Sequence, residues 1–267
     1  MMEKKSATLK KCVVCGEDLE MLFPNGPVFG MDRHPRMCKC MRTKQEKEAK
    51  ARAEREKAEI ISRNRSICFS DKKMYDWNFQ HDDKENPAMI HAQMYVKNFE
   101  EMKEKNIGYL FWGGVGTGKT FMAACIANAL LYNCFTVKMT NFATIINDLF
   151  SCEDKSAYVD ALVKYDLLII DDLGAERNTE YAVENVFNVI DRRYRTGKPL
   201  IITTNLHLKM ITNEQSVDKR RIYDRILELC TPVCVDGVSK RAKASKEKME
   251  QLKEMSKDYK EGEFANE

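Results

Sequence analysis

Apolar residues beyond about position 85 fall into short continuous runs, separated by stretches with a helical period. Turn-forming or polar residues bound these runs, which is typical of buried strands. We expect strands at residues 109–112, 135–137, 167–170, 200–204 and 232–235. Helical patterns lie at residues 90–102, 121–131 and 181–194. Because apolar strands that alternate with helices are typical of a parallel sheet covered on both faces, the sequence predicts an α/β fold.

The two ends of the chain lack this alternation. Residues 1–42 contain four cysteines around a stretch rich in proline and glycine, and residues 43–60 are nearly all strong helix formers. Pairs such as Glu46 and Lys50 have the i,i+4 spacing, so a solvated helical spacer is favoured over a DNA-binding element. We expect a cysteine-rich module at 1–42, a charged helical linker and connector at 43–84, the α/β domain at 85–238, and a charged, largely helical tail at 239–267.

Composition narrows the class of protein. The hydrophobic fraction of 43% is enough for a core, and 44 Lys and Arg against 41 Asp and Glu neither demand nor exclude nucleic acid. No apolar run is long enough to span a bilayer, and the first dozen residues do not resemble a secretory signal. Ten cysteines without an export signal indicate reduced thiols or metal ligands. We therefore expect a cytoplasmic protein without a membrane partner.

A glycine-rich loop follows the first expected strand of the α/β domain and precedes a helix. It fits the pattern GxxxxGK[ST] and consists of Gly113, Gly114, Val115, Gly116, Thr117, Gly118, Lys119 and Thr120. Glycines let backbone N–H groups close around phosphate oxygens, and the following helix points its positive end at them. Lys119 is expected to reach the β- and γ-phosphates, and the Thr120 hydroxyl to bind Mg²⁺. The motif predicts a P-loop ATPase.

Three polar residues follow two of the other expected strands. Asp171 and Asp172 come directly after residues 167–170, and Asn205 comes directly after residues 200–204. Ligands of parallel α/β sheets bind at this end of the strands. Asp171 is expected to hold the magnesium ion, and Asp172 to orient or deprotonate the attacking water. Asn205 is expected to hold that water or to contact the γ-phosphate, although an asparagine at a strand end is also a common turn residue.

The motifs GGVGTGKT, LLIIDDLGAE, IITTNL and RIYDRI, in this order, resemble the AAA+ ATPases of the DnaC/DnaI helicase-loader and IstB-like group. The resemblance covers residues 77–241. It implies a five-stranded AAA+ core that binds ATP, with a vestigial helical lid because only a charged tail follows the last strand. The G-protein pattern NKxD is missing, which agrees with adenine.

The resemblance also assigns roles to individual residues. Lys119 and Thr120 correspond to the Walker A pair and Asp171 to the Walker B residue. Asp172 stands where many AAA+ proteins have glutamate and the loader group has aspartate, so slow, switch-like hydrolysis is expected. Asn205, Arg225 and Arg241 match, in that order, the first sensor, the arginine finger that reaches a neighbouring subunit, and, more weakly, the second sensor. A surface salt bridge is the alternative role for Arg225.

The cysteines of the first module have metal-ligand spacing. Cys12 and Cys15 form a CxxC knuckle, and Cys38 and Cys40 can complete a four-sulfur Zn²⁺ site, with His34 as a possible substitute ligand. A segment this short with few apolar anchors needs such a metal to fold. Most of the other cysteines lie in apolar runs and are expected in the core.

Three functions are compatible with these features. The favoured one is an ATP-dependent loader of a replicative hexameric helicase onto single-stranded DNA, because the resemblance implies that a cysteine-bearing first domain contacts the helicase. Lys138, Phe142 and Tyr158 are candidate single-strand contacts, although such aromatics are more often core residues. The alternatives are an IstB-like transposition helper that binds duplex DNA, and a zinc-containing adaptor whose nucleotide site does not turn over.

Overall fold

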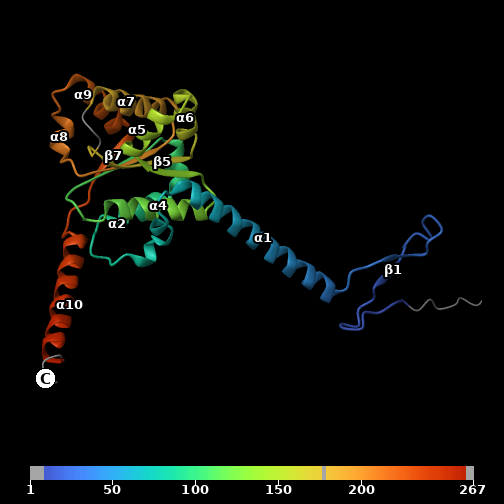
Figure 1. Ribbon diagram of the computed structural model, residues 1–267. Coiled ribbons are helices and arrows are strands. Elements are labelled where there is room, and N and C mark those ends of the chain that lie inside the picture. Colours follow the sequence, from blue (N-terminus) through green and yellow to red (C-terminus); the bar gives the residue numbers. More distant parts are fainter. Residues whose placement is uncertain (1–8, 176–178, 263–267) are drawn as a thin grey trace, which may run out of the picture. The chain divides into compact units, whose positions relative to one another are not determined.

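The structure, a computed structural model, describes residues 9–175 and 179–262 (Figure 1). It divides into two compact units, Met1–Ile60 and Ile61–Glu267, and parts of the expected terminal module and tail lie outside the described residues. Helix α1 (Lys39–Cys68) begins in the first unit and ends in the second. It contains the expected helical spacer but is longer at both ends, because flanking residues such as Met41 and Arg63 also suit a helix.

The first unit contains a small antiparallel pair of strands, β1 (Glu20–Leu22) and β2 (Arg33–Pro35), in which Met21 lies opposite His34. The sequence pattern did not predict this pair, because three-residue strands show no measurable alternation. The charged part of α1 carries exposed i,i+4 ion pairs, Lys44–Glu48 at 3.9 Å and Arg52–Glu56 at 3.7 Å. Exposed pairs of this kind stabilise a helix only weakly.

The second unit is built on the predicted five-stranded parallel sheet. Its strands are β3 (Gly108–Trp112), β4 (Val137–Asn141), β5 (Leu167–Leu173), β6 (Leu200–Thr204) and β7 (Cys230–Cys234), in the spatial order β4-β5-β6-β3-β7. The prediction of a strand at 135–137 was wrong in its bounds. The Asp166 carboxylate accepts hydrogen bonds from both the N–H and the hydroxyl of Thr136, at 2.9 and 2.8 Å, so that residue belongs to a turn before β4.

Helices cover both faces of the sheet, as Figure 1 shows. One apolar core lies under α2 (Met89–Lys97), α3 (Phe99–Glu104) and α4 (Lys119–Tyr132). The other lies under α5 (Phe142–Ser151), α6 (Lys155–Leu162), α7 (Glu180–Arg195), α8 (Leu208–Thr212) and α9 (Val217–Leu229). Two 3₁₀ turns, η1 (Lys72–Asp76) and η2 (Phe79–His81), connect α1 to α2.

Helices α5 and α6 lie between β4 and β5 and were not predicted. Each begins at a side chain that caps it: Asn141 accepts from the Thr144 N–H at 2.8 Å, and Asp154 from the Ala157 N–H at 2.9 Å. Such capping residues, followed by apolar residues at helical spacing, could have revealed both helices.

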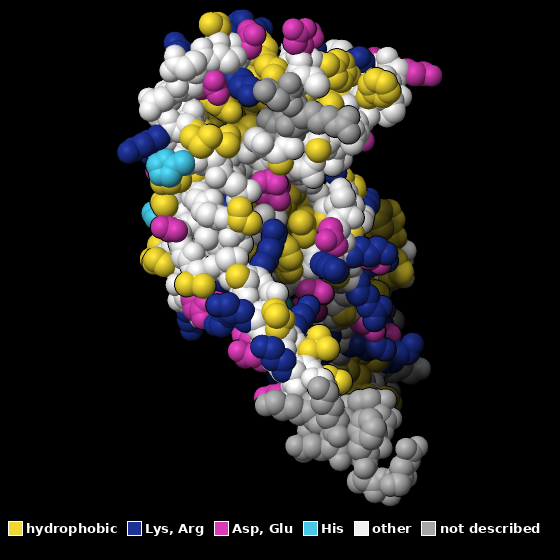
Figure 2. Space-filling model, turned by 60° about the vertical axis from the view of Figure 1, so that its left-hand side comes forward, with side chains coloured by type: hydrophobic (Ala, Val, Ile, Leu, Met, Phe, Trp, Pro, Cys, Tyr) yellow, Lys and Arg dark blue, Asp and Glu magenta, His cyan; other side chains and the backbone are white. Residues whose placement is uncertain are grey.

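The only helix that the structure describes after β7 is α10 (Lys240–Gly262). Its first N–H, that of Lys240, donates to the Gly116 carbonyl at 3.0 Å, so the tail begins directly on the phosphate loop. The described residues after β7 therefore contain no other helix that could form a lid. Lys and Arg gather with Asp and Glu where this segment leaves the domain, toward the bottom of Figure 2. Among the described residues, no helix is both long and apolar enough to cross a membrane.

Candidate nucleotide-binding site

The glycine loop between β3 and α4 is held tightly by its neighbours. Gly113 has φ 148° and Gly116 has φ 82°, and a Cβ on Gly113 would lie 2.4 Å from the Val235 carbonyl oxygen. Only glycine fits this conformation and this close backbone approach. Helix α4 begins at the end of the loop, so its first N–H groups are free to face an anion.

Lys119 is buried at the start of α4, with 6% of its surface exposed. Its ammonium donates to the Gly113 and Gly114 carbonyls at 3.0 and 2.6 Å, and to Oδ1 of Asn205 at 2.8 Å. Burial lowers the pKa of Lys119, while the carboxylates of Asp172 and Asp171 oppose that shift. The cation is thus positioned inside the loop, where a phosphate oxygen could replace these carbonyl partners.

Asp171 lies beside Thr120, as the magnesium hypothesis requires. The Thr120 hydroxyl is 3.0 Å from Oδ1 and 3.2 Å from Oδ2 of this carboxylate, and the Thr203 hydroxyl donates to Oδ1 at 2.5 Å. Burial raises the pKa of Asp171, against the hydrogen bonds from Thr203 and Thr120. One hydroxyl and one carboxylate are hard oxygen ligands, the type that Mg²⁺ prefers. The donor set therefore fits a magnesium ion held by Thr120 and Asp171.

Asp172 has a left-handed backbone with φ 61°, which is uncommon for a residue other than glycine. Its carboxylate accepts a hydrogen bond from the Asn205 side-chain nitrogen at 2.8 Å. Asn205 therefore connects Lys119 to Asp172 across the end of the sheet. The structure brings together all five polar side chains that the sequence analysis placed at this edge, namely Lys119, Thr120, Asp171, Asp172 and Asn205.

These residues line an open cavity of about 430 Å³. Arg241 and Lys240 form part of its wall, and Trp77, His81 and Phe121 form another part. The sequence analysis missed Trp77 and His81, because the segment before α2 has no periodic pattern. A cavity with basic groups on one wall and aromatic rings on another can hold phosphates and a flat base.

The sequence motifs and the fold match one known protein family. The sequence model of the family described as IstB-like ATP binding protein matches residues 37–248. The chain belongs to the IstB-like ATP-binding family. Its sequence is also similar to those of the helicase loaders DnaC and DnaI, and its fold to that of DnaI.

Individual relatives of this IstB-like protein are distant. It is 30% identical over 144 residues to the replicative helicase loader DnaC of Escherichia coli (strain K12), a match of 51% of this chain and 57% of that protein. It is 26% identical over 180 residues to the replicative helicase loader DnaI of Bacillus subtilis (strain 168), 61% of this chain and 58% of that protein. The chain thus spans little more than half the length of these relatives.

A solved structure shows the same fold. The crystal structure of DnaI superposes with a TM-score of 0.56 at 22% identity, covering 66% of this chain and 98% of that chain. The fold of the IstB-like protein, with its five-stranded parallel sheet, is therefore similar to that of DnaI.

Arg225 of the IstB-like protein lies on α9, away from the nucleotide cavity of its own chain. Its guanidinium donates to Asp191 Oδ1 at 3.0 Å and lies 4.8 Å from the centre of the Phe187 ring. Arg221, one turn earlier, lies over the same ring at 4.9 Å. Arg225 is thus in an intramolecular ion pair, and 28% of its side chain is exposed.

The cysteine cluster forms in the first unit. The sulfurs of Cys12, Cys15, Cys38 and Cys40 all lie within 4.8 Å of one another. Four thiolates around one Zn²⁺ at about 2.3 Å would be separated by about 3.8 Å, so the cluster fits that ion. Backbone N–H groups of Cys15 and Val14 lower the pKa of Cys12 to about 6, whereas hydrogen bonds with the Cys38 and Cys12 sulfurs raise the pKa of Cys40.

His34 does not belong to this cluster. Its Nδ1 lies 3.2 Å from the Pro35 carbonyl oxygen, and its ring lies 5.1 Å from that of Phe23. Among the other cysteines, Cys68, Cys125 and Cys230 are buried as expected, whereas Cys134 and Cys234 are exposed.

The expected single-strand contacts are mostly engaged elsewhere. Phe142 is 1% exposed and belongs to the core, the role that the sequence analysis favoured for it over a single-strand contact. The Tyr158 hydroxyl donates to Asp148 at 2.8 Å, and the Lys138 ammonium donates to the Ile67 carbonyl at 2.8 Å. Helical spacing on α5 reflects burial of an apolar face, which is the alternative that the sequence already favoured for an aromatic residue.

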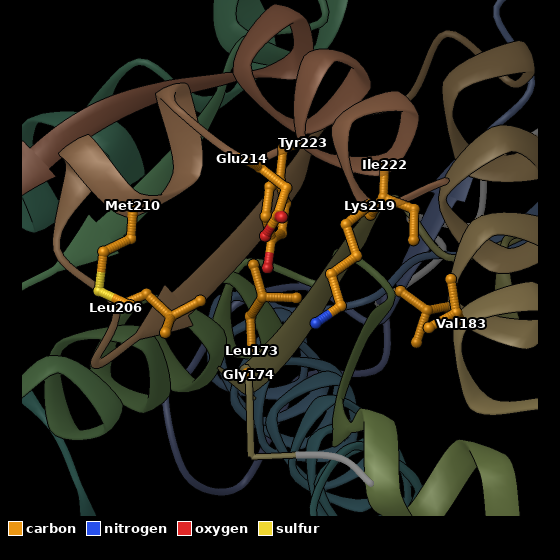
Figure 3. Close-up of a pocket in the computed structure, with 10 residues that line it drawn as sticks. Leu173, Gly174, Val183, Leu206, Met210, Glu214, Lys219, Ile222 and Tyr223 are labelled. Carbon is orange, nitrogen blue, oxygen red and sulfur yellow. The ribbon is translucent and has the colours of Figure 1, made fainter. Parts of the chain in front are cut away.

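A second cavity of about 250 Å³ lies near the end of β5 and is shown in Figure 3. Leu173, Val183, Leu206 and Ile222 contribute apolar side chains to its walls, and Lys219 and Glu214 also line it. None of the residues predicted to bind nucleotide lines this cavity. Leu173 and Leu206 directly follow Asp172 and Asn205, so the cavity adjoins the strand ends that carry the site.

Proposed function

We propose that this protein is an ATP-dependent loader of a replicative hexameric helicase onto single-stranded DNA, acting in the cytoplasm at replication initiation. The observation that carries the proposal is the connected set Lys119–Asn205–Asp172 at the mouth of the phosphate loop. A purely structural loop has no need of a buried cation linked to two strand-end polar groups. Membership of the IstB-like family and similarity to DnaC and DnaI support the loader role.

In this proposal the loop amides and Lys119 bind the triphosphate of ATP, and Thr120 and Asp171 hold Mg²⁺, which neutralises phosphate charge when bound. Asp172 orients or deprotonates the attacking water, and Asn205 fixes that water or the γ-phosphate. Arg241, at the cavity wall, contacts the nucleotide phosphates. A switch between ATP- and ADP-bound states then controls the affinity of the protein for the helicase and for single-stranded DNA.

Self-association completes the site. Arg225 would leave Asp191 and reach the γ-phosphate of a neighbouring copy, where a guanidinium stabilises charge that develops during phosphoryl transfer. The ion pair with Asp191 then keeps the finger folded back in an isolated subunit. Hydrolysis is expected only in the assembled state.

The first unit is the proposed helicase-docking module, held by Zn²⁺ on Cys12, Cys15, Cys38 and Cys40. Val13 and Phe29 are 100% and 96% exposed in this unit, which suits a protein contact better than a DNA contact. The resemblance to IstB-like proteins leaves a second candidate, a transposition helper that binds duplex DNA. The third candidate is an adaptor with a nucleotide site that does not turn over. Unlike the other two, it would not need Lys119 for its biological activity.

The test is association with the hexameric replicative helicase of the source organism, measured by size-exclusion chromatography with light scattering. We expect a complex with Mg·ATP that weakens with Mg·ADP and is not formed by Lys119→Ala. The same samples are mixed with labelled duplex and single-stranded DNA. Absence of a helicase complex at micromolar protein, together with cooperative duplex binding, would contradict the loader and favour the transposition helper. Full biological activity of Lys119→Ala would favour the adaptor.

A further inference from the structure

Thr203 lies on β6 beside the end of β5, and one hydroxyl contacts both acids of the site. It donates to Asp171 Oδ1 at 2.5 Å and accepts a hydrogen bond from the Asp172 N–H at 2.9 Å. The side chain is buried, with 1% of its surface exposed. Threonine is common in buried strands because it favours β structure, so the sequence pattern does not reveal that Thr203 contacts the two acids.

The strand register explains why the hydroxyl is needed. Ile170 lies opposite Ile202 and Leu173 opposite Thr204, so that Asp171 and Asp172 together face the single residue Thr203. Two residues opposite one form a β-bulge, in which an N–H leaves the regular ladder. The Asp172 N–H is the group affected, and the Thr203 oxygen satisfies it.

The bulge also sets the direction of both acid side chains. The left-handed backbone of Asp172, φ 61°, persists only where neighbouring groups hold it. This conformation lets the Asp172 carboxylate reach Asn205 while the Asp171 carboxylate faces Thr120. A regular strand would send two successive side chains to opposite faces of the sheet.

We propose that Thr203 is a positioning residue of the magnesium–nucleotide site: it orients the Asp171 carboxylate and fixes the bulge that aims Asp172. The inference rests on the proposed ATPase function. When the Thr120 oxygen binds the cation, Thr203 still holds Asp171 Oδ1. A carboxylate fixed in advance loses less rotamer freedom when it binds a metal or a water-coordinated metal.

Thr204 supplies a matched control on the same strand. It is also fully buried, but its hydroxyl donates to the Leu173 carbonyl at 2.7 Å and accepts from the Leu206 N–H at 3.0 Å. Thr203→Val and Thr204→Val therefore each replace a buried hydroxyl by a methyl group on the same strand. Only the first removes a contact to the acids of the site.

The experiment measures the affinity of the full-length protein for a fluorescent ATP analogue, with Mg²⁺ and with EDTA, and the rate of ATP turnover. In EDTA, Thr203→Val should bind the ATP analogue with nearly the affinity of the wild type. The factor by which Mg²⁺ increases this affinity (the magnesium gain) should be smaller than in the wild type by on the order of tenfold, since a hydrogen bond to a charged group is removed. Turnover should fall by at least the same factor. Thr203→Ser restores the hydroxyl and should recover both quantities, whereas Thr204→Val should keep the magnesium gain.

Two results would overturn the inference: an unchanged magnesium gain and turnover in Thr203→Val, or an equal loss in Thr204→Val, which would indicate general destabilisation. Thermal unfolding of both valine variants checks that each is folded at the assay temperature. A wild-type protein with no magnesium-dependent nucleotide binding would instead contradict the proposed function itself.

Discussion

The Lys119 ammonium donates to Oδ1 of Asn205 at 2.8 Å, on the open side of the phosphate loop. The nitrogen of the same amide donates to Asp172, so the asparagine is held from both sides. In the proposed mechanism the Lys119 ammonium binds a phosphate oxygen instead of Asn205, and Asp172 continues to orient the Asn205 amide. Asn205 is then poised to act on the γ-phosphate or the attacking water rather than to supply the main binding energy.

Asn205→Ala is therefore expected to lower ATP turnover by about a hundredfold, the typical loss when one donor to developing charge is removed. Nucleotide affinity should change by less than about fivefold, since the loop and Lys119 remain. Steady-state ATPase assays and binding of a fluorescent ATP analogue measure the two quantities. Asn133→Ala, an exposed asparagine at the end of α4, is the control. Equal turnover in Asn205→Ala and wild type would remove Asn205 from the mechanism.

Arg225 is expected to act on a neighbouring copy, although within its own chain it is paired with Asp191. Arg225→Ala should lower turnover by about a thousandfold, the lower end of the range for an arginine finger, with normal nucleotide binding. Arg220→Ala, on the same helix and with its guanidinium on the Glu214 carbonyl, should have little effect. ATPase rates at increasing protein concentration measure this difference.

Mixing two inactive variants separates action in trans from action in cis. Lys119→Ala lacks the nucleotide site but keeps Arg225, and Arg225→Ala has the reverse defect. A mixture should recover turnover because some interfaces combine an intact site with an intact finger. No recovery at any ratio, under conditions where the wild type assembles, would show that Arg225 has only its structural role with Asp191.

The four-cysteine cluster predicts one Zn²⁺ per chain, measured by elemental analysis of protein purified without added metal. Cys38→Ser should lose the ion and leave the first unit unfolded, because this unit has few buried apolar side chains to replace the metal. Cys134→Ser, an exposed thiol of the second unit, should retain it. Proteolysis within residues 9–38 should accelerate in Cys38→Ser and on treatment of the wild type with a chelator. Full metal content in Cys38→Ser would contradict this ligand set.

The sequence predicted the sheet and the phosphate loop well because both depend on local patterns. Continuous apolar runs mark strands buried on two faces, and the glycine spacing follows from backbone conformation alone. The acids at the end of β5 and the asparagine after β6 could be grouped from the sequence alone, because parallel strands end at one edge of the sheet. Asp171 and Asn205 were assigned to the same site by this reasoning.

Other features depend on contacts between distant segments. Trp77 enters the cavity wall through the irregular chain between α1 and α2, and Thr203 contacts the acids because a bulge shifts the register of β5. Neither the turn path nor the register shift leaves a periodic trace in the sequence. Phe142 illustrates the opposite case, since its helical spacing carried information about the core and none about DNA.

Arg193 is completely buried on α7, without a carboxylate partner. Its guanidinium donates to backbone carbonyls of the turns before β5 and β6, including Val163 and Tyr165 at 2.8 Å each and Pro199 at 3.2 Å. Burial lowers its pKa to about 10, so it remains charged at neutral pH. The side chain links two loops through buried and half-buried backbone carbonyls.

Arg193→Met should reduce the free energy of unfolding by about 3–5 kcal/mol, because several buried carbonyls lose their donor. The adjacent Arg192 supplies the control, since its ion pair with Asp160 is at the surface. Arg192→Met should cost less than about 1 kcal/mol. Urea unfolding followed by circular dichroism measures both variants. Equal destabilisation of the two would mean that the carbonyl contacts of Arg193 contribute no more than a surface ion pair.

Asp166 should make stability depend on pH. Burial by itself would raise the pKa of Asp166, but hydrogen bonds from Lys103 and Thr136 outweigh it and hold the pKa below its ordinary value. The charged form is therefore favoured by folding, and its contribution is present above the unfolded pKa of about 3.9. As the pH falls through the folded pKa, that contribution is lost.

Asp166→Asn is accordingly expected to lower the free energy of unfolding by about 1.5–3 kcal/mol at pH 7, the range for hydrogen bonds to a charged group. The difference from wild type should shrink below about pH 4, where Asp166 of the unfolded state becomes protonated while the folded state still holds it charged. Asp160→Asn removes an acid of an exposed ion pair and should change stability little at either pH. Urea titrations from pH 7 to pH 3 measure the three proteins, and a constant deficit of Asp166→Asn across that range would contradict the charge-based account.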